Sequence, residues 1–290
     1  MQTIKGTTKL LGVIGSPISH SLSPVMHNAA IAQMELDYVY LPLPVKPQDL
    51  EVALAGFAAI GVVGFSVTIP HKQTIMPLLS EISPVAQAVG AVNTVCRTAN
   101  GWSGTNTDVE GFLAPLDKNR DWSQTVAVIL GNGGAARAVV AGCAMLGCAG
   151  VRAIGRNREK LKEFLNSWNS SLSVNLSIHL WEELPDLISQ ADLLVNATPI
   201  GMYPHVNQSP VDADAIAKLP QGAIAYDLIY TPNPTQFLLT AASRGAITID
   251  GLEMLVQQGA AALQIWLQQP VPVDVMRQAL KQHLGLYQKS

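Results

Sequence analysis

The sequence has little charge and no strong excess of either sign. Only 13% of its 290 residues are charged, and the formal net charge is -3. Proteins that bind nucleic acid typically carry a basic stripe or patch, which this composition does not favour. With 48% hydrophobic residues, the chain is long enough for two globular domains, and we expect no nucleic-acid partner.

Long apolar runs are also missing. Gly, Pro or polar residues interrupt the apolar segments well before the roughly 18 to 20 residues that a membrane span needs. The first residues hold no long apolar region followed by a small-residue cleavage site, and they run directly into an expected strand. We therefore expect a cytoplasmic protein with no membrane association.

Cysteine and histidine are too few and too scattered for a disulfide framework or a metal site. The three cysteines, Cys96, Cys143 and Cys148, form no CxxC pair. The six histidines show no metal-ligand spacing. These features favour a reducing compartment and a protein without a bound metal.

What the sequence does contain is an alternation of strand and helix patterns. Apolar runs at 9–15 and 38–45 alternate with helical stretches, as in an open α/β sheet. After a polar patch at 117–124 the alternation starts again with the run "TVAVIL". We predict an α/β domain over 1–107, a Rossmann-like, doubly wound domain over 108–250, and C-terminal helices over 251–290 that pack back on the first domain.

A glycine-rich turn, "GNGGAARAVV", joins an expected strand to an expected helix. Gly131, Gly133 and Ala136 occupy the positions of the G-x-G-x-x-G/A dinucleotide fingerprint. Glycines let the backbone approach a pyrophosphate, whose charge is stabilised by the amides and dipole of the helix start. The pattern predicts a dinucleotide site rather than a turn without a ligand. The candidate contacts are Gly131, Asn132, Gly133, Gly134 and Ala135.

The next expected strand indicates which dinucleotide binds. A sheet that binds NAD usually has an Asp or Glu at this strand end, but here the strand ends in "AIGRNREK". Arg156, Arg158 and Lys160 instead crowd the position of an adenosine 2′-phosphate, which guanidinium groups recognise well. NADP(H) is therefore favoured over NAD(H). The alternative is a solvated basic loop, and Glu159 is the main counter-signal.

Five further motifs narrow the chemistry: "SPISHSLSPVMHN", "SVTIPHK", "GAVNTV", "GTNTD" and "DGLEMLVQQGA". Together with the glycine turn, they resemble the shikimate dehydrogenase family, in the same order over nearly the whole chain. The resemblance implies reversible, NADPH-dependent reduction of 3-dehydroshikimate to shikimate, on the route to aromatic amino acids. It also implies that residues 1–107 bind the substrate and that the ring lies between the two domains.

The resemblance assigns catalysis to Lys72 and Asp108. Lys72 would exchange a proton with the substrate oxygen, and Asp108 would pair with Lys72 and orient it. Lys72 also follows Pro70 in an expected helix, "PHKQTIMPLL", whose positive end disfavours an ammonium. Asp108 has an alternative role as the N-cap of the helix that follows it, and sequence alone does not separate the two roles.

The remaining substrate contacts are also carried over from the family. Ser21 and Ser23 would hydrogen-bond the carboxylate, although Ser23 before Pro24 is also a common helix cap. The family usually has Asn where this chain has Ser66, so one ring-hydroxyl contact is expected to be lost or passed to water. The other expected substrate contacts are Thr68, Asn93, Tyr230 and Gln258.

The resemblance adds cofactor contacts to those of the glycine turn. The adenosine end commonly reads Asn-Arg-Thr in the family and reads Gly155-Arg156-Asn157 here, so the arginine is present and Asn157 offers a polar phosphate contact. The expected contacts on the nicotinamide side are Thr198 in "NATPIGM", Leu228 and Gly251.

The sequence leaves two alternative functions open. One is a quinate/shikimate dehydrogenase with relaxed substrate choice and NAD use, which the basic loop and the paired serines disfavour. The other is a ligand-sensing homologue that has lost catalysis, which the joint presence of Lys72 and Asp108 disfavours. We expect a small-molecule substrate as partner and leave a homodimer open.

Overall fold

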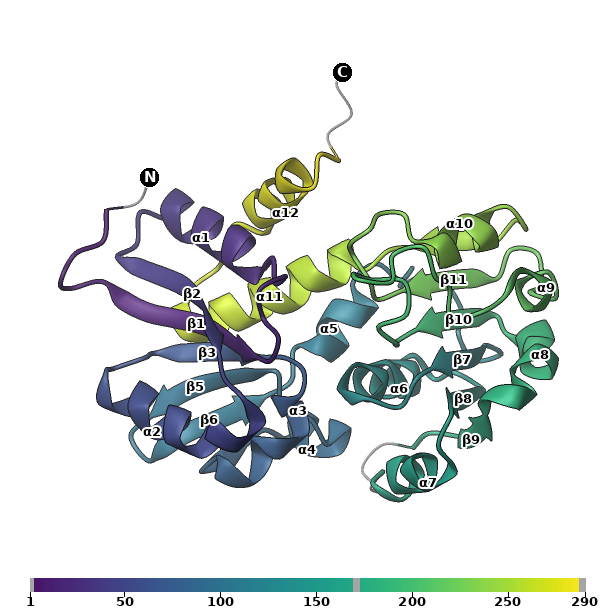
Figure 1. Ribbon diagram of the computed structural model, residues 1–290, viewed down its shortest axis with the longest axis horizontal. Coiled ribbons are helices and arrows are strands. Elements are labelled where there is room, and N and C mark those ends of the chain that lie inside the picture. The colour runs from purple at the N-terminus through teal and green to yellow at the C-terminus, as the bar shows by residue number, and fades with distance from the viewer. Residues whose placement is uncertain (1–2, 169–172, 287–290) are drawn as a thin grey trace. The chain divides into compact units, whose positions relative to one another are not determined.

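The computed structural model describes residues 3–168 and 173–286, and the chain divides into two compact units. The first unit comprises Met1–Gly111 and Leu255–Ser290, and the second comprises Phe112–Met254. Each unit contains one six-stranded sheet (Figure 1).

The sheet of the first unit is mixed, with the strand order β2-β1-β3-β5-β6-β4. Strands β2, β1 and β3 are parallel, whereas β5 runs antiparallel to both β3 and β6. The strand bounds are β1 Lys9–Gly15, β2 Tyr38–Pro44, β3 Gly64–Val67, β4 Glu81–Ile82, β5 Thr94–Thr98 and β6 Gly101–Thr105. Its helices include α1 Ser23–Gln33, α2 Leu50–Ala59, α3 His71–Thr74, α4 Pro84–Val89 and α12 Val273–His283, with 3₁₀ turns at Pro47–Asp49 and Met76–Leu78. It also contains most of α5 Asp108–Leu113 and of α11 Leu252–Leu267, the helices within which the two units divide.

The C-terminal helices pack back on the first unit, as the sequence predicts. Trp266 of α11 donates a hydrogen bond from its indole Nε1 to the Val95 carbonyl at 2.9 Å, and α12 packs against α1. Glycine at position 64 makes room for this indole, because a Cβ there would lie 2.3 Å from Trp266 Nε1. Segments from opposite ends of the chain therefore share one core.

The second unit is a doubly wound sheet. All six of its strands are parallel, in the order β12-β11-β10-β7-β8-β9. The strand order reverses between β7 and β10, as in dinucleotide-binding folds, where ligands bind beyond the carboxyl ends of the strands. The strand bounds are β7 Val126–Leu130, β8 Gly150–Gly155, β9 Leu176–Leu180, β10 Leu193–Asn196, β11 Ile224–Asp227 and β12 Ile247–Ile249.

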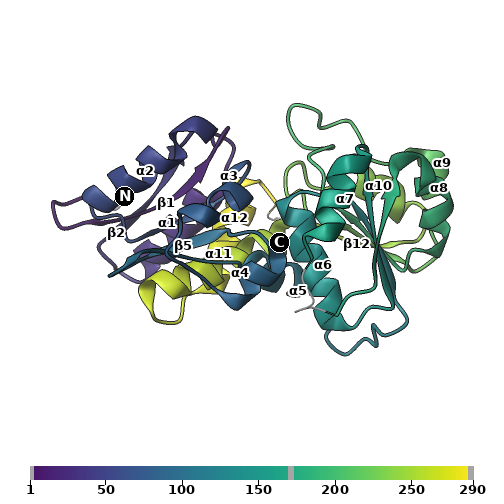
Figure 2. The same cartoon turned by 90° about the horizontal axis from the view of Figure 1, so that it is seen from below.

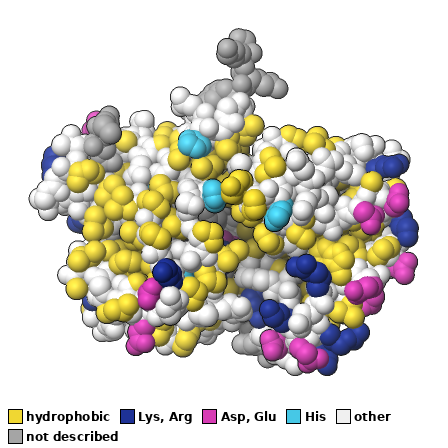
Figure 3. Space-filling model, viewed as in Figure 1, with side chains coloured by type: hydrophobic (Ala, Val, Ile, Leu, Met, Phe, Trp, Pro, Cys, Tyr) yellow, Lys and Arg dark blue, Asp and Glu magenta, His cyan; other side chains and the backbone are white. Residues whose placement is uncertain are grey.

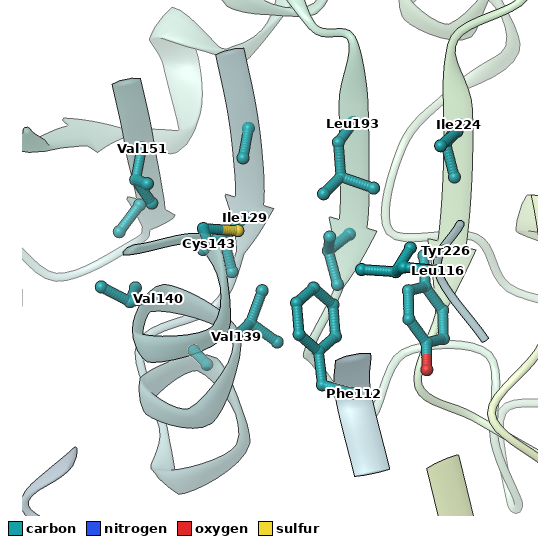
Figure 4. Packing of buried hydrophobic residues seen from close by; sticks show 14 of the residues in the cluster. Phe112, Leu116, Ile129, Val139, Val140, Cys143, Val151, Leu193, Ile224 and Tyr226 are labelled. Carbon is teal, nitrogen blue, oxygen red and sulfur yellow. The ribbon is translucent and has the colours of Figure 1, made fainter. Parts of the chain in front are cut away.

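Helices cover both faces of this second sheet. Helices α6 and α7 lie on one face, whereas α8, α9 and α10 lie on the other (Figure 2). Alternate residues of β7 point to opposite faces, so Ile129 packs with α6 while Val128 packs with α8 to α10. Figure 4 shows the first of these clusters, in which Phe112 stacks on Tyr226. The helix bounds are α6 Gly134–Leu146, α7 Arg158–Asn166, α8 Leu184–Leu187, α9 Ala213–Ile216 and α10 Gln236–Ala242, with 3₁₀ turns at Trp181–Glu183 and Ile188–Gln190.

The prediction of one helix over "PHKQTIMPLL" is wrong, because the helix in the structure is shorter. Helix α3 covers only His71–Thr74, and a 3₁₀ turn at Met76–Leu78 follows it. Pro77 explains the break, because proline has no amide hydrogen for the helical ladder and clashes with the preceding turn. Lys72 therefore lies on a single helical turn rather than at the start of a long helix.

Within residues 3–168 and 173–286, no helix combines the length and the apolar character that crossing a membrane would require. Figure 3 shows Lys and Arg side chains interspersed with Asp and Glu on the face that it displays.

A pair of glycine substitutions tests the packing of the first unit. Gly64→Ala should lower the free energy of unfolding by about 1–3 kcal/mol, because its Cβ would overlap Trp266 and lie 2.7 Å from the Val95 oxygen. Gly56→Ala should instead raise it by about 0.5–1 kcal/mol, because Gly56 lies within α2 with open space around its Cβ position. Denaturant melts measure both effects, and shifts of the same sign would contradict this packing.

Candidate active site

One edge of the first sheet brings three loops together. Because β3 and β6 both run antiparallel to β5, the end of β3, the start of β5 and the end of β6 lie at the same edge. Lys72 follows β3, Asn93 precedes β5, and Asp108 follows β6. The amide of Val67 donates to the Asn93 carbonyl at 2.7 Å and ties two of these loops together. Residues far apart in sequence therefore meet at one site.

Lys72 and Asp108 form a direct ion pair at this edge. Lys72 Nζ donates to Asp108 Oδ2 at 2.5 Å, and the two side chains are only 15% and 7% exposed. The Lys72 carbonyl accepts a hydrogen bond from the Val92 amide at 2.7 Å, which holds the lysine backbone. A pair with so little solvent contact is weakly screened, so its geometry is better defined than that of a surface pair.

Asn93 holds the other oxygen of the carboxylate. Its Nδ2 donates to Asp108 Oδ1 at 2.9 Å, and its Oδ1 accepts from the Thr107 amide at 2.8 Å. The Thr107 hydroxyl donates to the Gln258 carbonyl at 2.9 Å, and the Gln258 Oε1 lies 3.4 Å from Asn93 Nδ2. Both Asp108 oxygens are thus engaged by side chains of the site, and the contact of Asn93 with ring hydroxyls stays a prediction.

Sequence reasoning did not single out two residues that shape this network. Thr107 lies within the quoted motif "GTNTD", next to Asp108, and that adjacency was the available signal. Asn106 accepts a hydrogen bond from the Asp108 amide at 3.0 Å and donates to the Ala91 carbonyl at 2.9 Å. Its role depends on the sheet pairing, which sequence alone does not reveal.

The two serines lie at the start of α1. Ser21 Oγ accepts a hydrogen bond from the Ser23 amide at 3.3 Å, and Ser23 is buried. The alternative in which Ser23 caps the helix is wrong, because Leu22 occupies the N-cap position and makes no side-chain cap bond. Ser21 belongs to the loop that joins β1 to α1, Ser23 is the first residue of α1, and Thr68 belongs to the loop that follows β3.

Ser66 lies next to a buried tyrosine. The Tyr40 hydroxyl donates to Ser66 Oγ at 2.8 Å, and both residues are buried. Tyr40 stacks on the ring of His27 with 4.0 Å between ring centroids, and His27 Nδ1 bonds the Ser23 carbonyl at 2.8 Å. Burial lowers the pKa of His27 to about 4, because the charged imidazolium would be desolvated. Nothing in the sequence pattern indicated the role of Tyr40.

The glycine turn of the second unit fits an anionic dinucleotide. Gly131 has φ +110°, and a Cβ there would lie 3.2 Å from the Ala197 carbonyl oxygen, so glycine is required at this position. Gly133 is the N-cap of α6 and supplies no capping side chain, and a Cβ added there would meet nothing within 4 Å. The start of a 13-residue helix therefore faces open space, which suits a pyrophosphate.

The basic loop after β8 fits the phosphate of NADP. Arg156, Arg158 and Lys160 are all exposed at the end of β8 and the start of α7. Asn157 caps α7, because its Oδ1 accepts from the Lys160 amide at 3.0 Å. The counter-signal Glu159 pairs with Lys162 at 3.0 Å, so its charge is balanced locally. The donors present are cationic, as a phosphate ligand requires.

The residues expected near the nicotinamide follow β10, β11 and β12. Thr198 donates to Asn196 Oδ1 through both its amide, at 3.0 Å, and its hydroxyl, at 2.7 Å. Leu228 donates its amide to the Asn196 carbonyl at 3.1 Å. A Cβ on Gly251 would lie 2.2 Å from the Leu228 oxygen, so backbone packing already requires a glycine there. Tyr230 also belongs to the second unit, in the loop after β11.

The structure thus places the predicted residues in two groups. Lys72, Asp108, Asn93 and Gln258 share one hydrogen-bond network of the first unit, with Ser21, Ser23 and Thr68 on loops of the same unit. Tyr230 and the predicted cofactor contacts belong to the second unit. No group of three His, Cys, Asp or Glu residues that could hold a metal occurs in the part of the chain that the structure describes.

Two family models match segments of this chain. Residues 13–95 match the family described as the shikimate dehydrogenase substrate binding domain, and residues 251–281 match the shikimate 5′-dehydrogenase C-terminal domain. A shikimate dehydrogenase (NADP(+)) from Trichormus variabilis is 68% identical over 98% of this chain and 99% of its own length.

Solved structures of shikimate dehydrogenases are similar over nearly the whole chain. One in complex with NADP+ has a TM-score of 0.86 and 37% identity, and covers 97% of this chain and 98% of its own. Another, from Thermus thermophilus in complex with NADP(H) and shikimate, has a TM-score of 0.82 and 31% identity, and covers 94% of this chain and 99% of its own.

The buried His27 predicts how stability depends on pH. The folded state binds the His27 proton only near pH 4, whereas an unfolded histidine binds it near pH 6.5. The unfolded chain therefore holds more protons between these values, and this site should cost about 3 kcal/mol of stability as the pH falls through that window. His27→Phe, which keeps a ring against Tyr40, should show a shallower loss in denaturant melts from pH 7 to pH 4.5. If the free energy of unfolding falls equally with pH in the wild type and in His27→Phe, the prediction is contradicted.

Proposed function

The chain belongs to the shikimate dehydrogenase family, and from that premise we propose that its Lys72–Asp108 pair moves the proton in the family's reaction. The protein is an oxidoreductase of the shikimate pathway that acts on a CH–OH group, interconverting shikimate and 3-dehydroshikimate with NADP(H). The observation that carries the proposal is the 2.5 Å contact of Lys72 with a carboxylate whose second oxygen is held by Asn93.

The reaction separates a hydride from a proton. NADP(H), when bound, accepts or supplies the hydride at the reacting carbon. The Lys72 ammonium gives its proton to the substrate oxygen during reduction, and the amine takes that proton back from the hydroxyl during oxidation. Asp108 holds the Lys72 nitrogen in position in both directions, and Asn93 and Thr107 hold Asp108.

The hydroxyl and amide groups of the site suit a small polyhydroxylated ring with one carboxylate. Ser21 and Ser23 bind the carboxylate through hydroxyls at the start of α1. Thr68, Gln258 and Tyr230 bind the ring, and Asn93 acts mainly by orienting Asp108, because its amide is already bonded to that carboxylate. Ser66 is held by Tyr40, so the smaller side chain at this position still has a fixed hydrogen-bond partner.

The residues that would hold NADP(H) come from five segments of the second unit, which follow β7, β8, β10, β11 and β12. The glycine turn, Gly131 to Ala135, binds the pyrophosphate, and the loop with Arg156, Asn157, Arg158 and Lys160 binds the 2′-phosphate. Thr198, Leu228 and Gly251 line the nicotinamide side. The glycine required at position 131, the open N-terminus of α6 and the exposed cations after β8 support this assignment.

We further propose that the enzyme works in the cytoplasm. The three cysteines are thiols, as a reducing compartment favours.

Replacing the proton carrier tests the proposed function. Lys72→Ala should lower kcat for shikimate oxidation at least about 100-fold, because a positioned acid–base group is lost, while the Kd for shikimate changes by less than about threefold. Reduced-nicotinamide absorbance gives kcat, and equilibrium binding gives Kd. Lys46→Ala, at an exposed lysine of the same unit, is the matched control. Unchanged turnover in Lys72→Ala would remove Lys72 from the mechanism, and a wild-type protein without NADP-dependent oxidation of shikimate would refute the function itself.

A further inference from the structure

A buried carboxylate of the second unit has no part in the chemistry described so far. Asp227 is the last residue of β11 and is fully buried. Asn196 is the last residue of the neighbouring strand β10 and is fully buried as well. Both lie at the carboxyl ends of parallel strands, the edge at which folds of this type bind their ligands.

Asp227 accepts hydrogen bonds from three different segments. Its Oδ1 accepts from Asn196 Nδ2 and from the Ile229 amide, each at 3.0 Å. Its Oδ2 accepts from the Thr235 hydroxyl at 2.6 Å. Thr235 is the N-cap of α10, where its Oγ1 accepts from the Leu238 amide. One carboxylate therefore joins the end of β10, the loop after β11 and the start of α10.

Asn196 links Asp227 to the loop after β10 through further hydrogen bonds. Its Nδ2 also donates to the Ile200 carbonyl at 3.2 Å, and its Oδ1 accepts both hydrogen bonds from Thr198. Its backbone carbonyl accepts the Leu228 amide. The amide group of Asn196 is oriented by Asp227, because the carboxylate accepts from Nδ2 and so leaves Oδ1 facing Thr198.

Burying a carboxylate costs free energy of folding, because the charged group loses its hydration. Desolvation raises the pKa of Asp227 to about 6, although three hydrogen bonds oppose this shift. Apolar residues of similar volume often stabilise a core as well as a buried polar network does, or better. What the carboxylate supplies and an apolar side chain does not is a fixed direction for each group that donates to it.

We propose that Asp227 is a positioning residue for the cofactor, which fixes the loops after β10 and β11 through Asn196 and Thr235. This inference rests on the proposed function, which places Thr198 and Leu228 on the nicotinamide side. Those two residues are one hydrogen bond away from Asn196. Asp227 therefore controls affinity for the nicotinamide half of the cofactor and leaves the adenosine half, held by other loops, unaffected.

Two variants and two ligands test the inference. Asp227→Ala removes all three hydrogen bonds, and Asp227→Asn keeps the shape of the side chain but replaces one acceptor by a donor. Calorimetry then gives the Kd of each full-length variant for NADP+ and for adenosine 2′,5′-bisphosphate, which lacks the nicotinamide. The KM for shikimate is measured at saturating NADP+.

Asp192→Asn is the matched control. Asp192 Oδ2 accepts from the Val126 amide at 2.8 Å, next to the starts of β7 and β10, so it stabilises the same sheet at its opposite edge. This variant should lose stability without losing affinity for either ligand.

We expect the Kd for NADP+ to rise at least about tenfold in Asp227→Ala and less in Asp227→Asn. The Kd for adenosine 2′,5′-bisphosphate should stay within about twofold of the wild type, whereas the KM for shikimate should also rise, because Tyr230 lies in the loop after β11 that Asp227 holds. An unchanged Kd for NADP+ in folded Asp227→Asn and Asp227→Ala, or an equal loss for both ligands, would overturn the inference. If Asp227→Ala does not fold, Asp227→Asn alone decides between these results. Failure of the wild type to bind NADP+ would instead refute the proposed function.

Discussion

The contact between the Lys72 ammonium and the Asp108 carboxylate is the interaction on which the site of the first unit depends. It joins two residues that are 36 positions apart in sequence, and it forms because β3 and β6 flank the antiparallel strand β5. Asn93, at the start of β5, lies between them and holds the carboxylate from its other side. The pairing of β5 with β3 and β6 therefore places the Lys72 ammonium within hydrogen-bond distance of the Asp108 carboxylate.

In the second unit, too, the loops of the candidate site leave from one edge of the sheet, but the groups that they present differ in chemistry. Its strands are all parallel, so the loops that follow β7, β8, β10 and β11 leave from one edge of the sheet. Two of these loops present glycines and cations, which suit phosphate groups, whereas the other two are held by a buried network around Asp227 and Asn196. In the first pair of loops, the charged side chains suit the binding of phosphate. In the second pair, the buried carboxylate of Asp227 holds the loops in position.

Much of this arrangement could be predicted from sequence, because the signals are local. Apolar runs mark the buried parallel strands, and Gly131 marks the turn by a conformation that glycine adopts most easily. Strand β9 has no such apolar run, because Ser177 and His179 alternate with apolar residues and all five of its residues are only partly buried. The family motifs named Lys72 and Asp108, but the partners of these residues depend on sheet pairing.

Contacts between distant segments explain the rest of what sequence did not reveal. Tyr40 meets Ser66 because β1 pairs with both β2 and β3, and Asn196 meets Asp227 because β10 and β11 are neighbours. Neither pair has a spacing or composition that marks it. Pro77, in contrast, was visible in the sequence, and its effect on the helix after Lys72 follows from ordinary proline chemistry.

The central claim is that Lys72 and Asp108 act as one unit in proton transfer. The most direct test is a comparison of kcat for shikimate oxidation among Lys72→Ala, Asp108→Ala and the double variant. If the two residues act together, the double variant should be no more than about threefold slower than the slower single variant, because the second change removes a group whose partner is already gone. Losses that multiply in the double variant would show that the two residues contribute independently and would contradict the account.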